Sequence, residues 1–210
     1  PSFSGDGKTT LLVGEACEAH TLALQTDGKI VVAGFYTESD VFYPFAARFK
    51  TNGAPDNTFG LNGVAKLSFP AFAQSAVIQP DGKILLGGYS EGRMMLCRLL
   101  PNGAADAAFG NSGLVFFDLG SDRDDRFQAI ALQPDGKIVA GGSSVVYPTS
   151  AWAIVARFLP NGNLDSGFGQ GGYAKVQTAA IEYIEDLVVN ASGDITVTGS
   201  INQSETWSML

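Results

Sequence analysis

LQPDGKIVAGG, from Leu132 to Gly142, is the stretch that decides the fold, because near-copies of it recur along the chain. LQTDGKIVVAG runs from Leu24 to Gly34 and IQPDGKILLGG from Ile78 to Gly88, so the three copies start 54 residues apart. A weaker copy, VNASGDITVTG, runs from Val189 to Gly199. A fixed period of this length indicates one supersecondary unit that is repeated and stacked.

A second motif alternates with the first. Its copies are RFKTNGAPDNTFGLNG (48–63), RLLPNGAADAAFGNSG (98–113) and RFLPNGNLDSGFGQGG (157–172). In each copy an arginine and an aspartate stand eight residues apart on either side of a turn: Arg48 and Asp56, Arg98 and Asp106, Arg157 and Asp165. Since a hairpin brings such positions together, we expect an arginine–carboxylate bond within each repeat.

The third copy shows how one repeat folds. Its pattern predicts strands at 127–133, 137–142, 151–159 and 173–178, with a variable loop at 143–150. Pro134 and Gly136 suit the corners of a tight turn, which closes the first two strands into a hairpin. Both faces of these strands are apolar, which is typical of strands covered on both sides. Four-stranded antiparallel sheets that cover one another are the blades of a propeller.

We therefore expect an all-β fold, a β-propeller of four-stranded antiparallel blades, with residues 1–210 forming a single domain or a fragment of one. Four repeats are visible, at about 14–69, 70–119, 120–178 and 179–210, the last taken together with residues 1–13. Phe3 and Gly7 align with Phe59 and Gly63, so TTLLV (9–13) is expected to be a fourth strand without its first three. One blade completed from both termini and a stretch of a larger propeller both fit this pattern.

Composition excludes some partners. A net charge of −8 and a pI near 4.5 argue against nucleic acid and anionic membranes, which need clustered Lys and Arg. No apolar run approaches the roughly 18 residues that span a bilayer, so membrane insertion is not expected. Cys17 and Cys97 lie in different repeats without a metal-binding spacing, and we expect both to be free thiols.

The paired motifs, LQPDGKIVVAG and ARFxxNGxLDxxFGxxG in general form, resemble the delta-60 repeat family of bacterial β-propellers. The resemblance covers almost the whole chain, although the fourth copy has Gly193 and Asp194 where the others have Asp-Gly-Lys. It implies a β-propeller and a bacterial, secreted or cell-surface protein. It brings no catalytic motif to this chain.

An acidic connection, DLGSDRDDR (118–126), is unique to one inter-blade junction. Its four carboxylates repel one another unless they are solvated or neutralised by a bound cation. It is therefore read either as a solvated loop or as a Ca²⁺ site formed by Asp118, Asp122, Asp124 and Asp125. No other cofactor is expected.

The loops between second and third strands vary most and are expected to share one face of the propeller with the inter-blade connections. Phe35 and Phe42 lie there, together with the candidate ligand-binding residues Tyr36, Tyr43, Tyr89, Tyr147, Trp152 and Trp207. Aromatic faces near carboxylates and amides suit stacking on a sugar ring or gripping a peptide. The alternative is that some of them begin the third strand and pack inward.

Signals for catalysis are few. The single histidine, His20, stands in the column of Gln74, Gln128 and Glu185, and there is no nucleophile elbow, HExxH or phosphate loop. The sequence favours a non-catalytic extracellular module that binds or scaffolds, with a glycan, a peptide or a surface as partner. The alternative is a purely structural repeat that assembles with other chains or further domains of a longer polypeptide. More distant is a polysaccharide-acting enzyme using a carboxylate pair, with Glu18, Asp125, Glu182, Glu185 and Asp186 near the corners.

Overall fold

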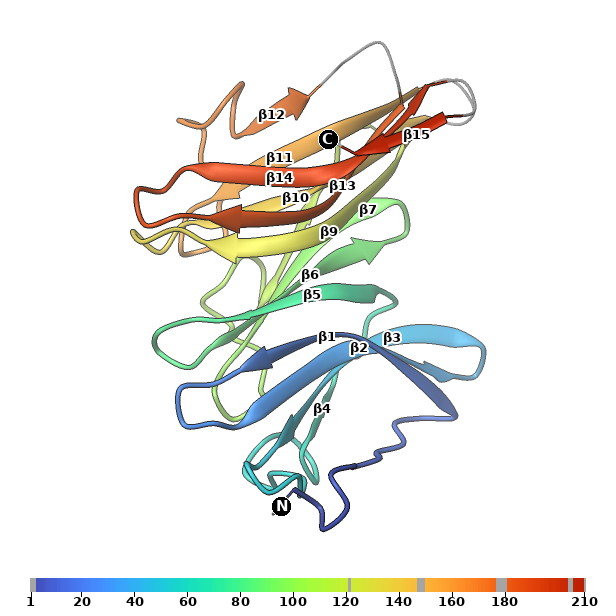
Figure 1. Cartoon of the computed structure of the whole chain (residues 1–210), viewed down its shortest axis with the longest axis vertical. Helices are drawn as coiled ribbons and strands as arrows, with labels where there is room; N and C mark the ends of the chain where they lie inside the picture. The colour runs from blue at the N-terminus through green and yellow to red at the C-terminus, as the bar shows by residue number, and fades with distance from the viewer. Residues whose placement is uncertain (1–2, 121, 147–149, 177–180, 204–205, 210) are drawn as a thin grey trace.

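The computed structural model describes residues 3–120, 122–146, 150–176, 181–203 and 206–209, and their strands form four antiparallel sheets that follow one another along the chain (Figure 1). We number these sheets blade 1 to blade 4. Blade 1 contains β1 (Ala16–Leu24), β2 (Ile30–Glu38), β3 (Val41–Phe49) and β4 (Val64–Lys66). Blade 2 contains β5 (Phe72–Ile78), β6 (Ile84–Ser90), β7 (Arg93–Leu99) and β8 (Leu114–Phe117). Blade 3 contains β9 (Asp124–Leu132), β10 (Ile138–Val146), β11 (Ser150–Phe158) and β12 (Tyr173–Val176). Blade 4 contains β13 (Ile181–Val189), β14 (Ile195–Gln203) and β15 (Thr206–Met209).

The blades are arranged as the sequence predicts for a propeller. The first strands lie side by side, β1 against β5, β5 against β9 and β9 against β13, so the blades converge on this inner edge. The short strands β4, β8 and β12 form the opposite edge of their sheets, and Figure 1 labels β4 and β12. The fold is thus an all-β arc of propeller blades, and the described part of the chain holds no helix that could cross a membrane.

Apolar clusters fill the spaces between blades. Ile130 of blade 3 packs on Gly87 of blade 2, with its Cγ2 2.5 Å from the place where a Cβ on that glycine would stand. Leu187 of blade 4 packs on Gly141 of blade 3 in the same way, at 2.7 Å. A large side chain on the first strand of one blade therefore fits a glycine on the second strand of the blade before it.

The two sequence motifs meet at one end of blades 1, 2 and 3. The Asp-Gly-Lys turns hold their glycine at positive φ, 81° at Gly82 for example, which non-glycine residues rarely adopt. The lysine of each turn reaches the aspartate of the second motif, with Lys83 Nζ 3.7 Å from Asp106 Oδ2. The same lysine–aspartate contact recurs in blades 1 and 3, so the alternation of motifs reflects direct contact.

The expected arginine–aspartate bonds are present in blades 1 to 3. Arg98 Nε donates to Asp106 Oδ2 at 2.8 Å, and both side chains are buried. Arg98 Nη1 also donates to the carbonyl of Pro160 in the next blade at 2.5 Å, and its guanidinium lies 4.5 Å from the centre of the Phe109 ring. Blade 1 repeats this set with Arg48, Asp56, Pro101 and Phe59. Arg48 and Arg98 therefore each tie their own turn to the following blade.

Two expectations need correction or refinement, and a third is confirmed. Residues 9–13 were expected to be a strand, but the structure assigns them to none, and Leu11 and Val13 pack on blade 1 beside Phe45 instead. They do not pair with β15, whose sheet has three strands in the described residues. The variable loop of blade 3 is shorter than predicted, since β10 continues to Val146. Cys17 and Cys97 are free, as expected, and burial raises the pKa of Cys97 to about 12.

Candidate functional site

Each first strand contains a β-bulge at the same place. The pairing of β5 with β6 skips one residue between Ala73 and Ser75, so Gln74 is the extra residue. The equivalent residues in the other blades are His20, Gln128 and Glu185. We call these four residues the bulge row. Bulges re-aim side chains and are over-represented next to functional sites.

The bulge explains an invariant glycine on each second strand. A Cβ on Gly88 would overlap the carbonyl oxygen of Phe72, because the bulge pushes that carbonyl toward β6. Gly34, Gly142 and Gly199 meet the carbonyls of Glu18, Arg126 and Tyr183 in the same way. The glycine that ends each AG, GG or TG pair on the second strand thus marks the bulge in the sequence.

The bulge row brings hydrogen-bonding groups to the inner edge of the arc. His20 Nδ1 lies 2.6 Å from Gln74 Oε1, so the bulges of blades 1 and 2 touch. The other imidazole nitrogen, Nε2, lies 3.2 Å from Glu18. Imidazole, amide and carboxylate groups of this kind both donate and accept hydrogen bonds.

Aromatic rings lie next to the bulge row across blades 1 and 2. Phe35, Phe42, Phe72 and Tyr89 form a continuous set of ring contacts with centroids 4.8–5.3 Å apart, which we call the aromatic row. His20 contacts one end through Phe35 at 5.4 Å. Arg126 covers the other end, 4.4 Å from the centre of the Tyr89 ring. Phe42 is 41% exposed, so the row presents an apolar surface to solvent.

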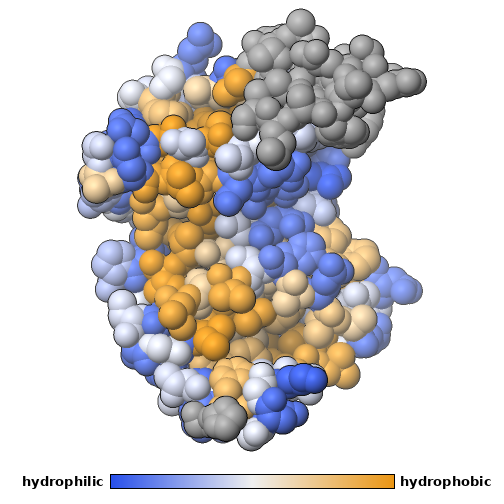
Figure 2. All heavy atoms as spheres, in the orientation of Figure 1, coloured by the Kyte–Doolittle hydropathy of each residue, from blue (hydrophilic) through white to orange (hydrophobic). Residues whose placement is uncertain are grey.

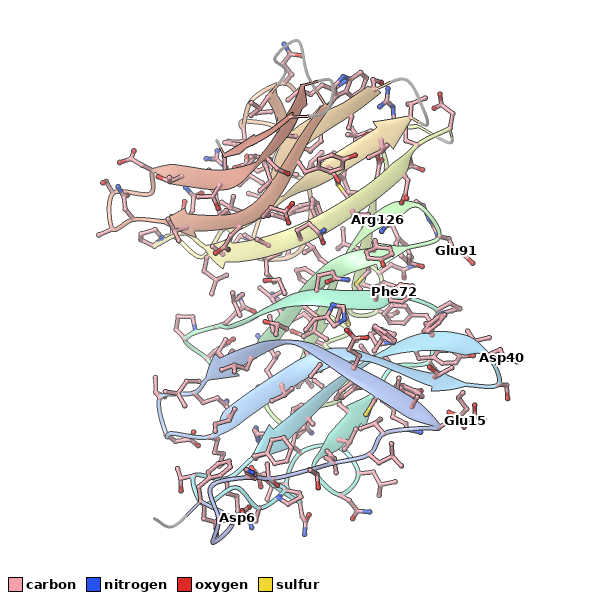
Figure 3. All side chains as sticks on the ribbon, turned by 45° about the vertical axis from the view of Figure 1, so that its right-hand side comes forward. Asp6, Glu15, Asp40, Phe72, Glu91 and Arg126 are labelled. Carbon is pink, nitrogen blue, oxygen red and sulfur yellow. The ribbon has the colours of Figure 1, made fainter. Side chains whose placement is uncertain are left out.

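A small pocket opens beside the aromatic row. Its volume is about 220 Å³, and it is lined by Phe42, Phe72, Val41, Pro70, Ala71, Ser90, Asp40 and Glu91. Asp40 and Glu91 sit on the hairpin tips at the same end of blades 1 and 2, with Phe72 and Arg126 further in (Figure 3). The pocket joins these hairpin tips to the connection before β5, as expected for loops that share one propeller face.

Of the six predicted ligand-binding residues, Tyr36, Tyr43, Tyr89 and Trp152 have described side chains, and these four do not share one surface. Tyr89 alone of those with described side chains lies on the aromatic row. Tyr36 is only 4% exposed and stacks on Tyr43 at 5.5 Å, within the apolar cluster of blade 1 that includes Val13. Burial raises the pKa of Tyr36, and its hydroxyl donates to the carbonyl of Leu67. These two tyrosines, one on β2 and one on β3, pack inward.

Trp152 is already enclosed by cations of this chain. The Arg123 guanidinium lies 3.6 Å from the ring centre and Lys175 Nζ 3.8 Å from it. Tyr147 lies outside the described residues, and so does the side chain of Trp207 on β15.

The four carboxylates of the acidic connection do not converge. Asp118 accepts from the Gly120 amide at 2.7 Å, and Asp124 accepts from Arg126 Nε at 2.9 Å. Asp125, adjacent in the strand, points to the opposite face and is fully buried. In the described ranges no three His, Cys, Asp or Glu side chains are placed to share a metal ion.

Asp125 is a structural carboxylate. Burial raises its pKa, while hydrogen bonds from Ser144 and the Leu119 amide act in the opposite direction. The Leu119 amide donates to Oδ2 at 2.7 Å, which pins the connection to the start of β9. Asp125 also donates its own amide to the Gly92 carbonyl and so holds the hairpin tip of blade 2.

Phe72, Gln74 and Gln128 were not among the predicted site residues. They can be found by comparing the strand register of the repeats. Two residues before each extra residue of the bulge row, the blades carry four different side chains: Glu18, Phe72, Arg126 and Tyr183. Positions that vary while their surroundings repeat are the ones free to serve a ligand.

The comparison with protein families agrees with the fold. A family model described as a domain of unknown function (DUF5122) β-propeller matches residues 25–59, 79–109 and 133–168. No curated protein matches the chain. The extracellular domain of a one-component system from B. thetaiotaomicron is similar at 12% identity and a TM-score of 0.42, over 91% of this chain and 21% of that one. Virginiamycin B lyase from Staphylococcus aureus is similar at 9% identity and a TM-score of 0.38, over 91% of this chain and 69% of that one.

This chain therefore spans about a fifth of the first of these structures. The matched segments begin at the Asp-Gly-Lys turns and end in the second motif, in each of blades 1 to 3. Sheets arranged as propeller blades, together with the matched segments in blades 1 to 3, identify the protein as a β-propeller built from repeats.

Proposed function

We propose that the protein is a non-catalytic binding module of the delta-60 type, exported by a bacterium, that binds an oligosaccharide along the inner edges of blades 1 to 3. The supporting observation is the juxtaposition of the bulge row with the aromatic row. Aromatic rings stack on the apolar faces of sugars, and amide, imidazole and carboxylate groups bind the hydroxyls.

The chemistry of the two rows favours a sugar over a nucleic acid or a purely apolar ligand. Arg126 is engaged by Asp124 and covers Tyr89, so it offers no cluster of positive charge. Asp40 and Glu91 add negative charge at the pocket rim. A neutral or amino sugar suits this environment, whereas an acidic one does not.

We assign no catalytic role to the carboxylates near the corners. Glu18 contacts His20, Asp125 is buried and bound to the Leu119 amide, and Glu185 lies 3.5 Å from the Ser200 hydroxyl. A hydrolytic pair needs two carboxyl groups that face one sugar, about 5 to 10 Å apart.

Phe42→Ala tests the proposal. Binding of a panel of neutral and amino oligosaccharides to the full chain is measured by titration calorimetry. The substitution is expected to weaken the best ligand at least about tenfold, since one aromatic stacking contact is worth roughly that factor. Phe116→Ala is the matched control, because Phe116 is similarly exposed (38%) but lies on the outer strand β8.

The result separates the two leading functions. Lost affinity in Phe42→Ala with an unchanged melting temperature, and normal affinity in Phe116→Ala, supports a glycan-binding face. If no oligosaccharide in the panel binds the unmodified chain, the glycan proposal is rejected and the structural repeat becomes the better reading.

A further inference from the structure

The N-terminal residues occupy the place of a preceding blade. The Ser4 amide donates to the Asn52 carbonyl at 2.8 Å, as the Gly60 amide does to Asn102 at the junction of blades 1 and 2. The Phe3 ring lies against Gly53 just as the Phe59 ring lies against Gly103. Blade 1 thus receives residues 3–13 through the same contacts by which blade 2 receives the end of blade 1.

The rest of this face of blade 1 has no blade packed against it. Leu22 is 69% exposed, whereas its equivalents Ala76, Ile130 and Leu187 are 8%, 4% and 5% exposed. Leu24 on the same face is 68% exposed. Figure 2 shows apolar spheres over the lower half of the molecule, where β1 and β2 lie in Figure 1.

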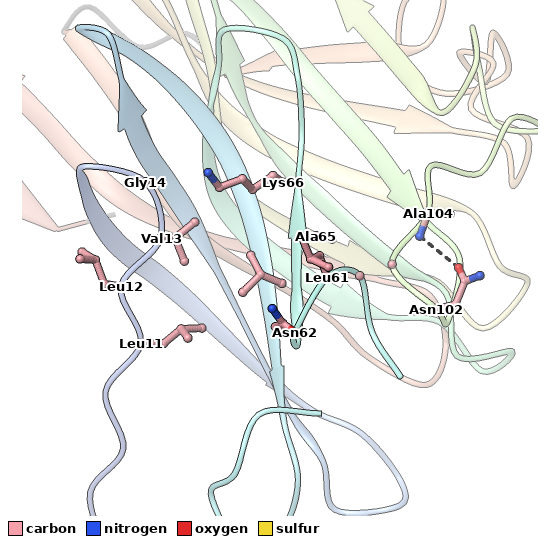
Figure 4. Close-up of a pocket in the computed structure, with 13 residues that line it drawn as sticks. Leu11, Leu12, Val13, Gly14, Leu61, Asn62, Ala65, Lys66, Asn102 and Ala104 are labelled. Carbon is pink, nitrogen blue, oxygen red and sulfur yellow. Dashed lines mark hydrogen bonds between the residues drawn. The ribbon is translucent and has the colours of Figure 1, made fainter. Parts of the chain in front are cut away.

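The second strand of blade 1 shows the same difference. Ile30 and Val32 are half-buried, while Ile84 and Leu86 at the equivalent positions of blade 2 are fully buried. A cavity of about 390 Å³ separates this sheet from the N-terminal segment, lined mainly by apolar side chains that include Ile30, Val32 and Phe49. A groove of about 710 Å³ continues from it between residues 11–14 and β4 (Figure 4).

The sizes of the side chains that meet between neighbouring blades indicate which kind of blade fits the open face of blade 1. Ile130 and Leu187 each pack on a glycine of the preceding blade, Gly87 and Gly141. At the position equivalent to Gly87 and Gly141, blade 1 has Ala33. The residue of blade 2 equivalent to Ile130 is the small Ala76, which lies in the same buried cluster as Ala33. Leu22 is large, so it needs a glycine opposite. Blade 4 has Thr198 at this position, because Thr198 pairs with Asp186, the residue directly after the bulge.

We propose that the open face of blade 1 binds the sheet of another propeller repeat, one that has glycine at the position equivalent to Gly87 and Gly141. The same face rejects blade 4 of a second copy, because the side chains of Thr198 and Leu22 compete for the space that a glycine would leave. The partner is thus a blade with two successive glycines on its second strand, as in blades 2 and 3. Its docking buries four apolar side chains together: Leu22, Leu24, Ile30 and Val32.

An extended chain tests this. Residues 120–167 are copied directly upstream of Phe3, in place of residues 1–2, so that Phe3 follows the added sheet as Phe168 follows its own. Hydrogen exchange of peptides from β1 and β2 is then compared with the unextended chain. The amides of β1 are expected to exchange at least about tenfold more slowly, since burial of one leucine is worth that factor. Peptides from blades 2 and 3 report whether the fold is intact.

Two variants make the test specific. Leu22→Glu is expected to leave exchange in the unextended chain unchanged and to abolish the protection in the extended one. Gly141→Thr in the added copy only, which imitates Thr198, is expected to remove most of the protection. Equal exchange of β1 with and without the extension overturns the proposal.

Sedimentation tests the alternative that blade 1 binds blade 4 of a second copy of the chain. Sedimentation of the unextended chain is expected to show no dimer that depends on Leu22. A dimer that Leu22→Glu dissociates overturns the selection by glycine, because blade 4 of a second copy is then accepted.

Discussion

Gly88 is expected to tolerate substitution less well than Gly82, although both are repeated in every full copy of the motif. A Cβ on Gly88 overlaps the Phe72 carbonyl, and that carbonyl is backbone in a paired strand that has no room to move. Gly82 has positive φ, but a Cβ there meets only the Pro101 ring, at 3.5 Å. Gly88→Ala is therefore expected to destabilise the protein by more than about 2 kcal/mol. Gly82→Ala is expected to cost about 1 kcal/mol.

Urea unfolding of the two variants at neutral pH measures this difference. A larger loss in Gly82→Ala than in Gly88→Ala would show that the bulge relaxes around a methyl group and that turn geometry limits the fold. The difference also bears on the site, since Gly88→Ala would displace Phe72 in the aromatic row.

The sequence predicted these glycines as repeated residues without predicting the bulge. A bulge changes register rather than composition, and FQAIALQ looks like an ordinary apolar strand. Phe72 consequently received no functional reading, while Tyr36 did, although its side chain is buried. Which face of a strand a residue occupies depends on a single inserted residue, and only pairing with the neighbouring strand reveals it.

Asp106 holds the arginine that joins blade 2 to blade 3, since Arg98 bonds to Asp106 through Nε and to the Pro160 carbonyl through Nη1. Asp106→Asn leaves Arg98, which is 6% exposed, without the counter-charge on its Nε. Removing one partner of a buried ion pair costs about 3 kcal/mol. Asp135→Asn is the control, because Asp135 forms an exposed pair with Lys137.

Thermal unfolding of the two variants is the measurement. Asp106→Asn is expected to lower the melting temperature clearly and Asp135→Asn to leave it near the unmodified value. Comparable losses would mean that the turn, rather than the buried bond to the following blade, is what both aspartates stabilise.

The spacing of eight residues was sufficient to predict this bond, because a tight turn fixes which residues face each other. The N-terminal strand was predicted from the same kind of alignment and is absent. A strand needs a partner for its backbone groups, and residues 9–13 pack on blade 1 through side chains without pairing with one of its strands. Local pattern therefore predicted contacts within a repeat but not those that depend on a neighbouring sheet.

For the whole molecule, the same network recurs in three successive blades and links stability to pH. Burial alone would raise the pKa of Asp56, but the Thr58 hydroxyl and amide, Arg48 and Lys29 outweigh it and lower the pKa to about 2. The pKa values of Asp106 and Asp165 are also lowered, against burial, by backbone hydrogen bonds and by Arg98 and Arg157. Acid should therefore act on blades 1, 2 and 3 together.

The sign follows from the lowered pKa. An unfolded aspartate titrates near about 3.9, so the folded state binds fewer protons than the unfolded state between about pH 4 and pH 2. The stabilisation from Asp56 is complete above this range and is lost as the pH falls through it. Urea unfolding at several pH values is expected to show a steep loss of stability there. Asp56→Asn should make that loss less steep than Asp122→Asn, which removes one charge from an exposed loop position. Identical slopes in these two variants would assign acid unfolding to carboxylates outside the repeated network.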